Sequence, residues 1–349
     1  MYQTFYRLSG KPFQPNPDPA FYFASKGHSR AFAYLKYGIY QGDGFIVITG
    51  DIGAGKTTMV QTLLAEIDSE QIVAAQLVST QLDADDLVHA VAAAFGLPIK
   101  DLSKAEMLAR FEAFLTGLVA DGRRALLIVD EAQNLTPRAL EELRMLSNFQ
   151  LGARSLLQTF LVGQPEMREM LSEPSMTQLR QRIIASYHLG PMDKDETRAY
   201  VMRRLERVDW VGDPRLDDEI FDRLHEVSGG LPRVINSVCN RLFLGAFMGQ
   251  KHEIGIAELE ETIHEMRDEI GVDARLGGPS GLPHHEVRET PGMAPPFISL
   301  ALSARLDRIE KGVAMALELL QQFAHPDGSV APIRGAERRP RFGARAPRA

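Results

Sequence analysis

The fold is decided by the stretch Phe45-Ile46-Val47-Ile48-Thr49-Gly50-Asp51-Ile52-Gly53-Ala54-Gly55-Lys56-Thr57-Thr58. Its central part, Gly50–Thr57, fits the pattern GxxxxGK[ST] without a mismatch. The apolar run before it is typical of a buried strand, and Thr57–Ile67 after it has a helical pattern. A strand, a glycine-rich turn and a helix in this order are the context that a phosphate-binding loop needs. We therefore predict such a loop at Gly50–Thr57.

The chemistry expected of this loop is the binding of a nucleotide phosphate chain. Glycines let successive backbone N–H groups point at the phosphate oxygens, and the start of the helix adds its positive end. We expect Lys56 to reach the β- and γ-phosphates and the Thr57 hydroxyl to ligate Mg²⁺. The predicted nucleotide-binding residues are Gly50, Asp51, Ile52, Gly53, Ala54, Gly55, Lys56, Thr57 and Thr58.

Two adjacent acids follow a second apolar run, Leu126–Val129. They stand where ligands bind in parallel sheets, at the carboxyl end of a buried strand. Asp130 is expected to hold Mg²⁺ through a water, and Glu131 to polarise the attacking water as a general base. An acid directly after the metal-binding aspartate is unlike small GTPases, and the sequence contains no NKxD guanine-reading motif. The sequence therefore predicts ATP and Mg²⁺ as ligands.

A glutamine and two neighbouring arginines are further candidates. Gln164 follows the strand Leu156–Val162, which we expect between the strands of Lys56 and Asp130, so that its amide would orient the attacking water. Arg182 precedes the last strand and is expected to act as an arginine finger on a neighbouring subunit's nucleotide, with Arg180 as the alternative. The plainer interpretations are a turn residue and solvated surface charges.

Arg233 is the fifth predicted catalytic residue. Gly229 and Gly230 end one helical pattern, and Pro232 stands near the first position of the next. This turn would aim Arg233 from a helical domain back toward the phosphates. A plain helix–turn–helix with an exposed arginine is the alternative.

The fold class expected from the whole pattern is α/β, a parallel sheet flanked by helices and followed by a small all-helical domain. The predicted strands are Phe45–Thr49, Ile72–Val78, Ala125–Val129, Thr159–Val162 and Ile183–Leu189. After Leu189 we expect no strand, and helices near Lys194–Val208, Asp217–Val227, Pro232–Met248 and Ile256–Glu269. The expected division is an arm (1–28), an ATPase domain (29–190) and a helical lid (191–270).

The arm, from Tyr2 to Phe23, is dense in aromatics and prolines, so we expect an extended segment laid over a core. Glycine and proline supply ten of the 28 residues at 271–298, which predicts a flexible linker. Residues 299–325 follow a heptad pattern from Leu302 to Phe323, which fits either a short coiled coil or docking helix, or an amphipathic helix folded onto its own core. Residues 326–349 form an arginine-rich tail that we expect to be disordered.

Composition narrows the function classes. The net charge is −7, and the tail contributes +4, so the rest of the chain carries −11. This argues against binding nucleic acid through bulk charge. The lone Cys239 excludes an internal disulfide and is expected to be a buried hydrophobe. The sequence contains neither a signal peptide nor a spanning apolar run, so we expect a cytoplasmic protein, or one held at the inner membrane through partners.

With these residues in place, the chain resembles the P-loop AAA+ ATPases of the general secretion pathway protein A type, which are related to transposition and origin-recognition ATPases. The resemblance spans about residues 2–270. It rests on Lys11-Pro12-Phe13, Pro17-Asp18-Pro19, Phe21, His28, Ala31, Tyr37-Gly38-Ile39, Ile48–Thr58, Asp130-Glu131-Ala132-Gln133-Asn134-Leu135, Gly163-Gln164-Pro165-Glu166, Gln181-Arg182-Ile183 and Gly230-Leu231-Pro232-Arg233-Val234-Ile235-Asn236.

The resemblance implies ATP bound between the α/β domain and the lid, with the arm and Gly27–Arg30 near the adenine, and assembly of the chain with itself. Secretion members usually continue into a membrane helix and a peptidoglycan-binding part, and we expect neither in this chain. It looks more like relatives found with exosortase and exopolysaccharide-export systems. The partners expected are secretion or polysaccharide-export components reached through the C-terminal helix. A DNA-associated transposition-type ATPase and a non-hydrolysing nucleotide-gated scaffold are the alternatives.

Overall fold

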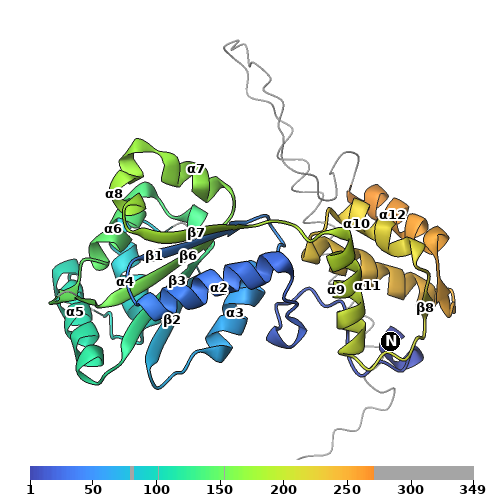
Figure 1. Cartoon of the computed structure of the whole chain (residues 1–349), viewed down its shortest axis with the longest axis horizontal. Coiled ribbons are helices and arrows are strands. Elements are labelled where there is room, and N and C mark those ends of the chain that lie inside the picture. The colour runs from blue at the N-terminus through green and yellow to red at the C-terminus, as the bar shows by residue number, and fades with distance from the viewer. Residues whose placement is uncertain (79–81, 101, 153, 271–349) are drawn as a thin grey trace, which may run out of the picture. The chain divides into compact units, whose positions relative to one another are not determined.

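The computed structural model describes residues 1–78, 82–100, 102–152 and 154–270 (Figure 1). The expected linker (271–298), heptad helix (299–325) and arginine-rich tail (326–349) lie outside the described residues.

A five-stranded parallel sheet with the order β2-β3-β6-β1-β7 forms the centre of the α/β part (Figure 1). Its strands are β1 (Phe45–Gly50), β2 (Ile72–Val78), β3 (Arg124–Asp130), β6 (Leu157–Gly163) and β7 (Ile183–Leu189). All five predicted strands are present, and β6 lies between β3 and β1 as expected. Because the strands are parallel, the residues that follow β1, β3 and β6 meet at one edge of the sheet.

Each central strand is buried on both faces, which explains the continuous apolar runs. Successive side chains point to opposite faces of a strand. Phe45 and Val47 pack in the core built with α4 (Ala84–Ala94), α5 (Lys104–Ala120), α6 (Pro137–Leu146), α7 (Glu166–Ser172) and α8 (Thr177–Arg180). Ile46 and Ile48 pack in a second core, with α2 (Lys26–Gln41) and α3 (Lys56–Glu66).

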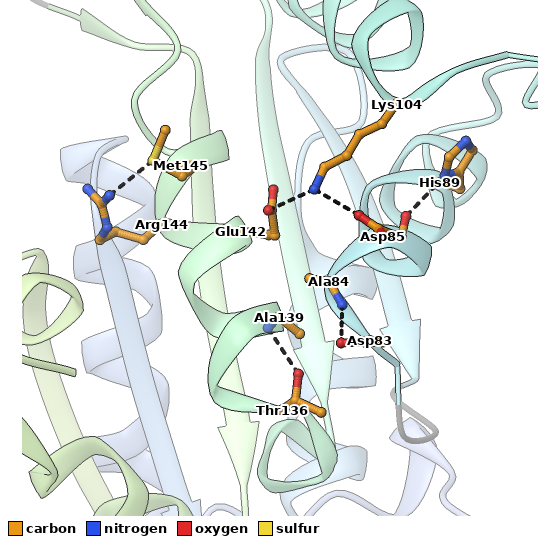
Figure 2. A network of polar contacts seen from close by, with 10 residues as sticks. All are labelled: Asp83, Ala84, Asp85, His89, Lys104, Thr136, Ala139, Glu142, Arg144 and Met145. Atoms are coloured by element: carbon orange, nitrogen blue, oxygen red, sulfur yellow. Dashed lines mark hydrogen bonds and ion pairs between the residues drawn. The ribbon is translucent and has the colours of Figure 1, made fainter. Parts of the chain in front are cut away.

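Polar contacts join α4, α5 and α6, three of the helices that pack in the core with Phe45 and Val47 (Figure 2). Lys104 Nζ on α5 lies 3.2 Å from Asp85 Oδ1 on α4 and 2.8 Å from Glu142 Oε1 on α6. The backbone N–H groups of Ala84 and Ala139 donate to Asp83 and Thr136, which cap α4 and α6. Since the Asp85 side chain is 88% exposed, its ion pair with Lys104 contributes at most about 1 kcal/mol to the stability of the fold. The apolar core that these helices share therefore contributes more to their packing.

Among the described residues, four helices follow the sheet: α9 (Lys194–Glu206), α10 (Glu219–Ser228), α11 (Pro232–Met248) and α12 (Ile256–Ile270). They share a separate core that includes Leu205, Leu224 and Phe243. Cys239 is fully buried there, and burial raises the pKa of its thiol to about 12, as expected of an inert small hydrophobe. None of the helices in the described residues is long and apolar enough to cross a membrane.

Several short elements were not predicted. β4 (Gln150–Leu151) and β5 (Arg154–Ser155) form an antiparallel pair before β6, and β8 (Arg215–Leu216) pairs in parallel with β9 (Glu253–Ile254) in the helical part. The expectation of no strand after Leu189 is therefore wrong for β8 and β9. Two residues are too few to show a strand periodicity. Two 3₁₀ turns, η2 (Ala132–Asn134) and η3 (Pro174–Met176), were also not predicted.

The arm differs from the extended segment that its prolines predict. It begins with the helix α1 (Tyr2–Phe5), ahead of the prolines, and contains the 3₁₀ turn η1 (Pro19–Phe21). Asp18 caps η1, since its Oδ1 accepts from Ala20 N at 2.9 Å, and Pro19 fits the first turn because its missing N–H is not needed there. The buried rings of the arm join the core of the helical part; they are Tyr2, Tyr6 and Phe13.

Candidate nucleotide-binding and hydrolysis site

A cavity of about 430 Å³ lies at the carboxyl edge of the sheet, within the size range of small-molecule sites. Its lining comes from four parts of the chain: the arm with the start of α2, the predicted phosphate loop, the helical part, and Glu131 directly after β3. Phe21 and His28 represent the first, Lys56 the second and Arg233 the third. The segments expected near the adenine and those expected near the phosphates therefore share one cavity.

The phosphate loop has the backbone that its glycines predict. Gly53 and Gly55 have φ values of +82° and +96°, a left-handed region that other residues rarely adopt. A Cβ on Gly55 would lie 2.8 Å from His28 Nε2, so a side chain is excluded by space as well. The loop leads directly into α3, and Lys56, Thr57 and Thr58 of its first turn line the cavity. The N–H groups of a first helical turn have no partner within the helix, and they carry the positive end of the helix dipole.

Lys56 is the first residue of α3, and its side chain is buried. Its Nζ donates to the carbonyls of Gly50 at 2.6 Å and Asp51 at 3.0 Å. Burial lowers the pKa of Lys56, while the nearby carboxylates of Glu131 and Asp130 oppose that effect. The ammonium is thus held among the loop carbonyls and beside the two acids that end β3.

The residues expected to hold Mg²⁺ are in direct contact. Thr57 Oγ1 donates to Asp130 Oδ2 at 3.1 Å, and Asp130 is only 3% exposed. Burial raises the pKa of Asp130, against the hydrogen bonds from Thr57 and from the Glu131 backbone. A hydroxyl and a carboxylate are the oxygen donors that Mg²⁺ takes from proteins when phosphates and waters supply the rest. The described residues contain no group of three or more His, Cys, Asp and Glu side chains that could hold a metal ion.

Glu131 follows Asp130 with a left-handed backbone, φ +53°. Its Oε2 accepts from Gln164 Nε2 at 3.0 Å and from Gln133 Nε2 at 2.7 Å. Burial favours a higher pKa for Glu131, but these two amides and the charge of Lys56 outweigh it and lower the pKa. The predicted base and the predicted water-orienting glutamine therefore lie together. Gln133 is a contact that the sequence did not predict.

Arg233 is placed against the phosphate loop. Its backbone N–H donates to Gly53 O at 3.1 Å, and its side chain lines the cavity. The preceding turn needs its glycine, since a Cβ on Gly230 would lie 2.1 Å from Met192 O. Met192 N in turn donates to Gly230 O at 3.0 Å, which fixes the turn to the segment between β7 and α9.

Arg182 and Arg180 do not lie with the other candidates. Ile183 pairs with Phe45 at the start of β1, which puts both arginines at the sheet edge opposite the phosphate loop. The Arg182 guanidinium donates to Ser147 O at 3.0 Å, to Ser147 Oγ at 2.9 Å and to Asn148 Oδ1. Arg180 donates to Leu171 O at 2.8 Å and to Thr177 Oγ1 at 3.0 Å. Neither arginine is among the residues that line the cavity.

His28 joins the start of α2 to the phosphate loop. Its Nε2 lies 2.9 Å from Ala54 O, and its Nδ1 lies 2.7 Å from Ser25 Oγ. A carbonyl only accepts, so Nε2 carries the proton and Nδ1 accepts from the Ser25 hydroxyl. His28 is 5% exposed, and burial lowers its pKa below the ordinary value of 6.5, against the effect of the Ala54 hydrogen bond.

This geometry predicts a pH-dependent stability. Because the folded-state pKa of His28 is lowered, the unfolded chain takes up the proton first, and stability falls as the pH drops below about 6.5. Each unit of lowering corresponds to about 1.4 kcal/mol. His28→Gln keeps an amide donor for Ala54 O without a titrating group, so it should lose less stability than the wild type between pH 7.5 and pH 5.5 in urea unfolding. His264→Gln, at an exposed histidine, is the control, and an equal loss in wild type and His28→Gln would contradict the prediction.

Comparison with known proteins shows what the chain is similar to. Residues 39–171 match the family model of the AAA domain. The chain is similar to general secretion pathway protein A of Aeromonas hydrophila, at 38% identity over 273 residues. The match covers 77% of this chain and 50% of that protein, so the chain spans about half the length of this curated relative.

Solved structures share the fold. The ORC2 protein of Aeropyrum pernix, in its ADPNP–ADP complexes, has a TM-score of 0.53 at 16% identity, over 69% of this chain and 66% of that one. Cdc6p of Pyrobaculum aerophilum has a TM-score of 0.55 at 15% identity, over 72% of each chain. At these identities the likeness concerns the fold alone. It matches the parallel sheet with its flanking helices and the helices that follow.

Proposed function

We propose that this chain, an AAA+ ATPase of the general secretion pathway protein A type, binds Mg²⁺-ATP in the cavity at the carboxyl edge of its sheet and hydrolyses it as an oligomer. The observation that carries the proposal is the contact between the phosphate loop and the end of β3. Thr57 and Asp130 lie 3.1 Å apart there, directly before the carboxylate of Glu131. Each of these groups supplies a different part of phosphoryl transfer.

Binding of ATP follows from the loop and its lysine. The N–H groups of Gly53–Thr57 would receive the β- and γ-phosphate oxygens, and Lys56 Nζ would exchange its bonds to Gly50 O and Asp51 O for phosphate oxygens. Arg233 would approach the phosphates from the helical part. Phe21 and His28 border the same cavity and would face the base and ribose.

Hydrolysis needs a base for the attacking water and neutralisation of the phosphate charge. Glu131, held in its ionised form, would accept the proton of the water, and Gln164 would orient that water. Thr57 and Asp130 would hold Mg²⁺, which when bound supplies positive charge to the β- and γ-phosphate oxygens. The water oxygen then bonds to the γ-phosphorus as the bond to ADP breaks, and the proton passes to Glu131.

We propose that this ATPase serves a secretion, polysaccharide-export or envelope-assembly machine, from the cytoplasm or at the inner membrane through partners. Similarity to general secretion pathway protein A supports the secretion-related class. The partner itself would be reached through residues 299–325. A DNA-associated transposition-type ATPase is the second candidate, and a net charge of −11 outside residues 326–349 weighs against it. DNA that stimulates hydrolysis would favour the second candidate over the first.

Lys56→Ala tests the binding step. We expect ATP affinity to fall about 10²-fold, because the phosphates lose their charge-assisted hydrogen bonds to the ammonium. Nucleotide titration measures this, with circular dichroism to verify the fold. Lys36→Ala is the matched control, since Lys36 is exposed and pairs with Glu66 on the surface. Wild-type affinity in a folded Lys56→Ala protein would contradict the assignment of the loop.

A further inference from the structure

We propose that Gln133 is a positioning residue for hydrolysis, one that fixes the carboxylate of Glu131 and joins it to the end of β6. This inference rests on the proposed function of the site and deepens it. Gln133 lies two residues after the proposed base, in the 3₁₀ turn η2.

Both the nitrogen and the oxygen of the Gln133 side-chain amide form hydrogen bonds. Its Nε2 donates to Glu131 Oε2 at 2.7 Å, while its Oε1 accepts from the backbone N–H of Gln164 at 3.0 Å. The side chain therefore bridges the ends of two adjacent strands, β3 and β6, at the edge where the nucleotide is expected. A displacement of Gln164 would reach Glu131 through this bridge as well as through the direct bond of the two side chains.

The surroundings hold this bridge in place. A Cβ on Gly163 would lie 2.9 Å from Gln133 Oε1, so the approach of the amide depends on a glycine at the end of β6. The η2 turn is closed by the bond from Leu135 N to Ala132 O at 3.1 Å, and the side chain of Ala132 is fully buried. Gln133 thus extends from a rigid turn toward a rigid strand end.

The arrangement at the carboxylate explains what the bridge does for catalysis. Both amides, from Gln133 and Gln164, bond to Oε2 of Glu131. Among the described residues this leaves Oε1 as the oxygen that can accept the proton of the attacking water. A carboxylate with one oxygen fixed has a defined direction for the other, and small losses of orientation at a reacting group cost up to about 10²-fold in rate.

Substitutions of Gln133 separate this role from general support of the fold. Gln133→Leu removes both hydrogen bonds at similar size, and we expect kcat to fall about 10- to 10²-fold with ATP affinity unchanged. Gln133→Glu keeps an acceptor for Gln164 N but loses the donor to Glu131, and it should lower kcat as well. Gln71→Leu removes an exposed amide that bonds Asp68, and it should behave as wild type.

A double-mutant cycle gives the decisive readout. If Gln133 acts through Glu131, Gln133→Leu should cause no further loss of single-turnover hydrolysis in a Glu131→Gln background. The positioning role would be overturned if the rate losses of Gln133→Leu and Glu131→Gln multiply in the double variant. A wild-type kcat in Gln133→Leu, or full activity in Gln133→Glu, would overturn it as well. Unchanged hydrolysis in Glu131→Gln alone would instead overturn the proposed function of Glu131, and the bridge would fall with it.

Discussion

Glu131→Gln is expected to bind ATP as tightly as the wild type and to hydrolyse it at least about 10²-fold more slowly. The substitution preserves size and leaves an amide oxygen that can accept the bonds from Gln133 and Gln164, so the local structure should persist. It removes the group that takes the proton of the attacking water. Since Lys56, Thr57 and Asp130 are unchanged, the binding of the phosphates should be unaffected.

Steady-state hydrolysis and nucleotide titration on the same preparation separate binding from turnover. Glu66→Gln is the matched control, because Glu66 is a surface carboxylate at the end of α3 that pairs with Lys36. An unchanged rate in Glu131→Gln would show that another group is the base. Loss of ATP binding would instead mean that Glu131 contributes to the affinity for the phosphates.

The sheet could be predicted from the sequence because its strands are buried on both faces. Apolar runs such as Phe45–Thr49 leave few alternatives once glycine-rich or polar turns bound them. Chain order does not fix spatial order, and the position of β6 between β1 and β3 was expected from the class of P-loop ATPases. Elements without a periodicity escaped prediction, as β8 and β9 did with two residues each.

The arm shows a second limit of prediction from the sequence, which is contact between distant residues. Its prolines predict extension, yet its position depends on a residue 190 positions away. Arg204 on α9 is buried, bonds to the carbonyls of Pro12 and Gln14, and stacks on the Phe21 ring at 4.7 Å. Nothing local in the sequence pairs an arginine in a helix with the carbonyls of a distant loop.

The candidate site likewise contains residues that the sequence predicts and one contact that it does not. Lys56, Thr57, Asp130 and Glu131 follow from local patterns, because strand ends and helix starts fix where such residues lie in a parallel sheet. Gln133 stands beside the acids in the sequence, but its role depends on the backbone N–H of Gln164 across the sheet. A distance between two strand ends is a property of the fold, and a motif does not encode it.

Arg182→Ala is expected to retain ATP binding and to lower hydrolysis by about 10³-fold or more, the effect of losing an arginine finger. The structure places Arg182 at the sheet edge opposite its own phosphate loop, so under this proposal it would act on a neighbouring subunit's nucleotide. To act there, its guanidinium must exchange the bonds to Ser147 and Asn148 for phosphate oxygens. Specific activity should therefore rise steeply with protein concentration. Arg180→Ala, at the alternative finger, tests which of the two arginines acts.

Mixing two inactive variants tests the shared site directly. The Glu131→Gln subunit keeps the arginine finger but lacks the general base. The Arg182→Ala subunit keeps the general base but lacks the finger. Equal parts of the two should recover activity, because some interfaces then pair the base of one subunit with the finger of the next. This recovery also shows that Arg182→Ala is folded, despite the loss of its bonds to Ser147. A mixture that stays inactive while the two proteins co-assemble, or a dilute monomer that works at full rate, would leave Arg182 as a surface charge that supports its own chain.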